Sequence, residues 1–142
     1  MKEKAVNYYK SGFSCSESVI SAAIDEGLCD KSLLAVAGAF SGGMSSGCLC
    51  GAVAGAQMVL GANYGKNNDC GNQEEARTKA KQFIEEFKKK RKATCCRVLS
   101  AGMEFSSPER KENCTNLVAE CAEILGDMVG WAEAHQRNKY LL

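Results

Sequence analysis

Apolar residues recur at spacings of three and four along most of this chain, and no segment alternates convincingly between apolar and polar positions. The first spacing places apolar side chains on one face of a helix, whereas alternation would indicate a half-buried strand. Pro108 is the only proline, so little in the sequence breaks such helices. The pattern therefore predicts an all-α fold, which we expect to be a compact helical bundle.

Capping and breaking residues divide this pattern into separate helices. Gly12 ends the first, and Ser14 with Glu17 has the spacing of a capping box, in which side chains pair with free amides at a helix start. Asp30 is expected to cap a third segment, and residues 67–71 are expected to form a turn. The other predicted helices cover residues 2–10, 14–26, 46–64, 73–92, a short segment after residue 94, and 113–135.

A glycine-rich stretch at residues 38–47 precedes the fourth predicted helix. Glycine adopts backbone conformations closed to other residues and lets a neighbouring backbone come close. Gly51 and Gly55 extend this property into the helix, which we therefore expect to be central. The loop and the helix start together indicate a site, and Gly43, Gly47 and Gly51 are the residues expected to contact a cofactor there.

Length and charge restrict the class of protein. The 142 residues suit one domain, residues 1–142, and the net charge of +1 favours neither nucleic acid nor a membrane as a partner. The N-terminus lacks the apolar core of a secretory signal, and no apolar segment reaches the roughly 20 residues of a membrane span. These observations predict a cytoplasmic protein.

The nine cysteines are the main chemical feature of the sequence. An odd number cannot pair completely within one chain, and cytoplasmic cysteines are mostly reduced. The thiolate is the reactive form, and the amides and dipole of a helix's first turn stabilise it. Cysteines stand at four predicted helix starts, where we expect redox chemistry. They are Cys15, Cys48 with Cys50, Cys95 with Cys96, and Cys114.

Other residues bear on the start of the last helix, on haem binding and on the remaining cysteines. Ser107 before Pro108 is also a helix-start pattern, and a helix beginning there would place Cys114 in its interior. Covalent haem c needs the sequence Cys-x-x-Cys-His, which does not occur, and the only histidine is His135. Structural roles suit the remaining cysteines better, since two lie in predicted turns and one on the packing face of the last helix. They are Cys29, Cys70 and Cys121.

Four segments, in order, resemble the family named C_GCAxxG_C_C for its cysteine pattern. They read GFSCSESV at residues 12–19, CGAVAGA at 50–56, CRVL at 96–99 and CTNLVAECAEIL at 114–125. The resemblance implies a redox role with Cys15, Cys50, Cys96 and Cys114 as the signature thiols. Cys48 departs from the pattern, and it could resolve an oxidised Cys50 or supply an additional ligand.

Two kinds of redox chemistry remain open at this point. In one, Cys50 pairs with Cys15 or Cys96 and cycles between dithiol and disulfide, with Cys50 expected to be the most reactive thiol. In the other, Cys15, Cys50, Cys96 and Cys114 bind an iron–sulfur cluster or another metal that carries electrons. Structural zinc and a non-enzymatic interaction module are further alternatives. The sequence does not distinguish an enzyme from an electron carrier, identify the redox protein partner, or decide whether the chain forms a homodimer.

Overall fold

The structure is a computed structural model that describes residues 1–66 and 72–130. This part of the chain forms seven α-helices, and the predicted all-α fold is confirmed. A 3₁₀ turn at Gly38–Phe40 and a π-helical turn at Gly43–Gly47 connect the third helix to the fourth. The helices are α1 Lys2–Lys10, α2 Cys15–Asp25, α3 Leu33–Ala37, α4 Gly51–Tyr64, α5 Gln73–Arg91, α6 Cys96–Leu99 and α7 Pro108–Met128.

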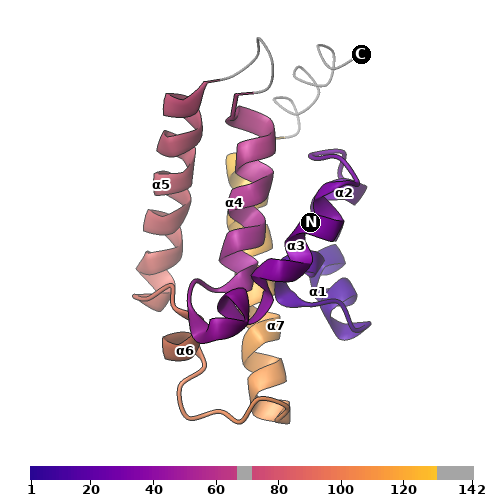
Figure 1. Cartoon of the computed structure of the whole chain (residues 1–142), viewed down its shortest axis with the longest axis vertical. Helices are drawn as coiled ribbons and strands as arrows, with labels where there is room; N and C mark the ends of the chain where they lie inside the picture. Colours follow the sequence, from indigo (N-terminus) through magenta and orange to yellow (C-terminus); the bar gives the residue numbers. More distant parts are fainter. Residues whose placement is uncertain (67–71, 131–142) are drawn as a thin grey trace.

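Helix α4 is the centre of the bundle, as predicted. It contacts α2, α5 and α7, and Figure 1 shows it upright between α5 on one side and the α1–α3 group on the other. Other helices can pack against α4 on several sides because its side chains are small and apolar, whereas a charged face would remain in water. The fully buried core draws on all four of these helices and includes Val19, Ile20, Val53, Val59, Phe83, Phe87, Val118 and Leu125.

Glycines allow α2 to lie directly against α4. A Cβ atom built on Gly55 would come within 2.9 Å of the backbone oxygen of Ser16. A Cβ on Gly51 would overlap the sulfur of Cys15. The two backbones are therefore closer than side chains on both helices would permit, and the start of α2 meets the start of α4.

Several predicted boundaries are confirmed. Ser14 and Glu17 form the capping box of α2 with both of its hydrogen bonds, and α1 has the predicted bounds. The predicted helix at residues 73–92 corresponds to α5, which ends in a left-handed Lys92. The prediction that Asp30 caps the third helix is wrong, because Ser32 is the N-cap of α3 and no side chain caps this helix; the Asp30 carboxylate instead accepts from the Ser32 amide.

The fourth helix begins at Gly51 and not at residue 46, so this prediction is wrong. Left-handed backbone in the π-helical turn and a non-helical segment at residues 48–50 precede it. This segment pairs with residues 94–96, where the Cys50 amide donates to the Thr94 carbonyl at 2.8 Å and the Cys96 amide donates to the Cys48 carbonyl. These bonds satisfy amides that a helix would otherwise use. Cys48 therefore lies outside the helix and Cys50 is its N-cap.

The last helix begins at Pro108, five residues before the predicted start. Ser107 caps it, since its hydroxyl accepts from the Arg110 amide. The alternative start is thus confirmed, and the expectation that Cys114 stands at a helix start is wrong, because Cys114 lies in the second turn of α7. The predicted end at His135, the turn at residues 67–71 and Cys70 lie outside the described residues.

Replacing glycines in α4 tests the close contact with α2. Gly55→Ala should lower the free energy of unfolding by about 1–3 kcal/mol, because the added methyl group meets the backbone of α2. Gly61→Ala in the same helix is the matched control. Its Cβ would meet nothing within 4 Å, so it should stabilise the protein by up to about 1 kcal/mol through helix propensity. Equal effects of the two substitutions in urea unfolding would contradict this packing.

Candidate functional site

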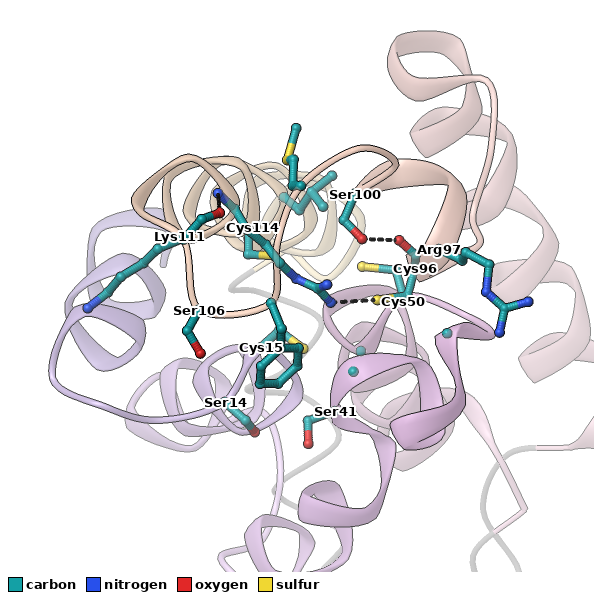
Figure 2. A pocket seen from close by; sticks show the side chains of 18 of the residues that line it. Ser14, Cys15, Ser41, Cys50, Cys96, Arg97, Ser100, Ser106, Lys111 and Cys114 are labelled. Carbon is teal, nitrogen blue, oxygen red and sulfur yellow. Dashed lines mark hydrogen bonds between the residues drawn. The ribbon is translucent and has the colours of Figure 1, made fainter.

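Four cysteines from distant parts of the chain line one cavity of about 1140 Å³ (Figure 2). Cys15 is the first residue of α2, Cys50 precedes α4, Cys96 begins α6, and Cys114 lies in α7. These are the four signature thiols that the family resemblance implies, whereas Cys48, the fifth cysteine expected at the site, does not line the cavity. Three of them stand at the start of a helix or next to it, and the fourth faces the same cavity from a helix side.

The four thiols are near enough to influence one another. Negative charge on Cys15 or Cys96 would raise the pKa of Cys50, and charge on Cys96 or Cys114 would raise that of Cys15. Cys50 is the deepest, with 4% of its surface exposed, whereas the other three are half-buried. A reagent entering the cavity therefore meets Cys15, Cys96 or Cys114 before it meets Cys50.

The glycine loop shapes this cavity. Gly47 and Gly51 line it, whereas Gly43 lies behind it and does not. A Cβ on Gly43 would come within 2.8 Å of the Cys96 Cβ, and its backbone φ is +60°. Gly43 therefore packs against Cys96, and a larger residue at this position would displace the thiol.

Desolvation determines the proton affinity of the deeper thiols. Burial raises the pKa of Cys50 to about 12, although the amides of Ala52 and Val53 at the start of α4 act in the opposite direction. Burial also raises the pKa of Cys15. The helix-start amides are present as the sequence indicated, but they do not compensate for the loss of water. The expectation that Cys50 is the most reactive thiol is therefore wrong.

Cys96 has a different environment, with a cation at its sulfur. A side-chain nitrogen of Arg110 donates to Cys96 Sγ at 3.7 Å, and the same guanidinium stacks 4.9 Å from the ring centre of Phe105. The Ser100 hydroxyl donates to the Cys96 carbonyl at 2.6 Å and fixes the short helix α6. A guanidinium in this place stabilises negative charge that develops on the sulfur during a reaction.

Cys114 lies next to the half-buried phenol of Tyr9. Burial, the charge of Cys114 and a hydrogen bond with Cys114 raise the pKa of Tyr9 above its ordinary value of 10.0. The phenol therefore keeps its proton at neutral pH and can donate a hydrogen bond to the sulfur. Tyr9 comes from α1, so a fourth long helix contributes to the site.

The other described cysteines lie away from the cavity. Cys48 and Cys95 are exposed on the paired segments, and neither lines the cavity. Burial raises the pKa of Cys29 to about 11. Cys121 is fully buried in the core, as its place on the packing face predicted, and burial raises its pKa well above the ordinary value.

Sequence reasoning missed the basic side chains of the cavity. Arg97, Arg110 and Lys111 all line it. The sequence could have indicated Arg110, because Arg110 and Cys114 are four residues apart and share one face of a helix that begins at Pro108. Arg97 directly follows Cys96 and donates to the Ser46 carbonyl of the glycine loop at 3.1 Å.

The spacing of potential ligands bears on metal binding. Within residues 1–66 and 72–130, no group of three or more His, Cys, Asp or Glu side chains is placed to hold one metal ion. The four cavity thiols thus share a space but are not arranged as ligands of a single metal ion. His135 lies outside the described residues.

The fold and the cavity define an all-α protein with a cysteine-lined site. The model of the family described as "Putative redox-active protein (C_GCAxxG_C_C)" matches residues 13–128, which is most of the chain. The chain belongs to this family, and the resemblance seen in the sequence is confirmed. No curated protein and no solved structure matches the chain. In the described part of the chain, no helix is long and apolar enough to cross a membrane.

The raised pKa of Cys50 predicts a loss of stability at alkaline pH. An unfolded thiol ionises near its ordinary value of 9.0, whereas Cys50 in the folded chain stays protonated to about pH 12. The folded state therefore holds its proton more tightly, and Cys50 should lower the free energy of unfolding by about 1.4 kcal/mol per pH unit above pH 9.

Urea unfolding at several pH values checks this expectation. Cys50→Ala lacks the titrating group. The difference in free energy of unfolding between this variant and wild type should therefore shrink steadily as the pH rises from about 9 to 11. Cys48→Ala is the control, because this thiol is exposed, and its curve should run parallel to wild type. A parallel curve for Cys50→Ala would contradict the buried thiol.

Proposed function

We propose that this chain is a thiol–disulfide redox protein in which Cys50 and Cys96 cycle between dithiol and disulfide. The observation that supports this most strongly is the cavity where four otherwise distant thiols meet. Membership of a redox-active family agrees with it. Two paired backbone segments hold Cys50 and Cys96 in one fixed arrangement, which lowers the entropy cost of joining their sulfurs.

Cys96 is the thiol that meets the external partner. It is half-buried at the cavity surface, and Arg110 donates to its sulfur. As a thiolate it attacks one sulfur of a disulfide, forming a mixed disulfide and expelling the other sulfur as a thiolate. Arg110 lies where it stabilises negative charge on Cys96 before the attack and again when the mixed disulfide is resolved.

Cys50 is the resolving thiol. Its burial keeps it protonated at neutral pH and inaccessible to reagents in solution. When it gives up its proton, its sulfur attacks Cys96 Sγ in the mixed disulfide and releases the second half of the partner. Proximity makes this step intramolecular, which offsets the small thiolate fraction of Cys50. Two electrons then have passed from the protein to the partner.

The other two cavity thiols have supporting places in this proposal. Cys15 lies against Gly51, the neighbour of Cys50, and is the second candidate for the resolving role. Cys114 lies next to Tyr9, and both residues line the cavity. Gly47 and Gly51 keep the space between these sulfurs free of side chains. Cys48 is exposed outside the cavity and is not required for the cycle.

Trapping the mixed disulfide tests these roles. Reduced protein treated with the neutral reagent hydroxyethyl disulfide should form an intramolecular disulfide, whereas Cys50→Ser should stop with one reagent half attached to Cys96. Cys96→Ser should form neither product in the cavity. Cys48→Ser, which changes an exposed thiol, should behave as wild type. Mass spectrometry of the quenched reactions measures this, and an intramolecular disulfide in Cys96→Ser at the wild-type rate would refute the assignment.

Metal analysis separates the dithiol cycle from a metal centre. In the described chain the sulfurs are not arranged to hold a single metal ion, and the proposed dithiol cycle needs no metal. Protein prepared without oxygen should therefore be colourless and contain substoichiometric iron and zinc. A brown preparation with stoichiometric iron would instead establish a cysteine-bound iron–sulfur cluster. Stoichiometric zinc without iron would establish a structural zinc site.

A further inference from the structure

The charged residues that line the cysteine cavity are all basic. Arg97, Arg110 and Lys111 are among its lining residues, whereas no aspartate or glutamate is. The whole chain has almost equal numbers of acidic and basic residues. The positive charge of the cavity is therefore a local property, which the composition does not impose.

These cations have no carboxylate partners in the described part of the chain. The ion pairs found there involve other residues, mostly along α1, α5 and α7. Three glutamates follow or precede the cations closely in sequence, but they are exposed to solvent and do not line the cavity. They are Glu104, Glu109 and Glu112.

Most hydrogen-bonding capacity of the two arginines is free for a ligand. A guanidinium has five N–H donors, whereas Arg97 donates one hydrogen bond, to the Ser46 carbonyl, and Arg110 donates one, to the Cys96 sulfur. Arginine forks are well suited to bind carboxylates through two parallel hydrogen bonds. The cavity thus presents unsaturated anion-binding groups beside its reactive thiol.

Size and lining favour a small molecule as the ligand. The cavity volume of about 1140 Å³ slightly exceeds the roughly 300–1000 Å³ of typical small-molecule sites. Its walls also carry aromatic rings and serine hydroxyls, including Phe13, Phe105, Ser41 and Ser106. This mixture suits a ligand with a short apolar chain and charged ends.

We propose that the substrate of this site is a small disulfide whose ends carry carboxylates, and that Arg97 and Lys111 select it by charge. This inference rests on the proposed thiol–disulfide function. The carboxylates bind the cations at the cavity wall, and the central sulfurs of the ligand then lie at Cys96. Arg97 and Lys111 are exposed at the cavity rim, so they attract an anion as it enters, and salt screens this attraction.

The reaction balances without a further reagent. Cys96 attacks one sulfur of the ligand, a bond forms between the two sulfurs, and the ligand's own sulfur–sulfur bond breaks with release of one thiolate. Cys50 then attacks Cys96 and releases the second thiolate. The protein loses two electrons and two protons, the ligand gains two electrons, and the protons go to the two released thiolates.

A series of three disulfides of equal length tests the charge selection. Dithiodipropionate, hydroxyethyl disulfide and cystamine share one skeleton but end in carboxylates, hydroxyls and ammonium groups. For each disulfide, the rate at which it oxidises the reduced protein is divided by the rate at which it oxidises dithiothreitol. This ratio removes differences in intrinsic reactivity among the three disulfides. Dithiodipropionate should exceed cystamine by on the order of tenfold at low salt, and the preference should fall towards one at high salt.

The double variant Arg97→Gln/Lys111→Gln should lose most of this preference while still reacting with hydroxyethyl disulfide. Lys88→Gln is the matched control, since it removes a positive charge from α5, no residue of which lines the cavity. It should retain the preference. Equal normalised rates for the three disulfides, or an unchanged preference in the double variant, would overturn the inference and leave the proposed function intact.

Binding of an unreactive analogue separates the two proposals. Suberate has the length and carboxylates of dithiodipropionate but no sulfur, so it should slow alkylation of Cys96 in the reduced protein, whereas hexanediamine should not. Protection by suberate in a protein that reacts with no disulfide would support the anion site and reject the thiol cycle. Absence of protection would overturn the anion site.

Discussion

Two backbone hydrogen bonds between residues 48–50 and residues 94–96 determine the arrangement of the site. They join the end of the glycine loop to the segment before α6, far apart in the sequence. Because the Cys50 amide is used in this pairing, the chain turns helical only at Gly51, and Cys50 becomes the cap of α4. The same pairing fixes Cys96 at the start of α6. Loss of these bonds would separate the two sulfurs on which the proposed cycle depends.

The chemistry at the cavity follows from a competition between desolvation and helix-start amides. A helix terminus contributes about 0.3–1 kcal/mol to the stability of a nearby negative charge. Removing such a charge from water without a partner costs several kcal/mol, so burial dominates at Cys50 and Cys15 and raises their pKa values. Cys96 is less buried than Cys50 and has Arg110 at its sulfur. The two kinds of environment support different roles for the thiols in one exchange reaction.

Local signals predicted much of the fold, whereas tertiary contacts determined the rest. The capping box at Ser14 and the helix at residues 73–92 depend on neighbours in sequence, and both predictions are confirmed. The late start of α4 results from hydrogen bonds to residues more than forty positions away, which no local pattern contains. The convergence of the four thiols followed from the assumption that several helix starts meet. Two of the three basic residues that line the cavity, Arg110 and Lys111, were missed because they lie at the start of α7, which was predicted to begin five residues later.

The central claim is that Cys50 and Cys96 form one redox pair inside the cavity. It is tested most directly by oxidising the folded, reduced protein with one equivalent of diamide, blocking the remaining thiols and mapping the disulfide-linked peptides. The account predicts a link between the peptides containing Cys50 and Cys96, which dithiothreitol removes. A link between the exposed residues Cys48 and Cys95, with Cys50 and Cys96 both recovered as free thiols, would contradict it.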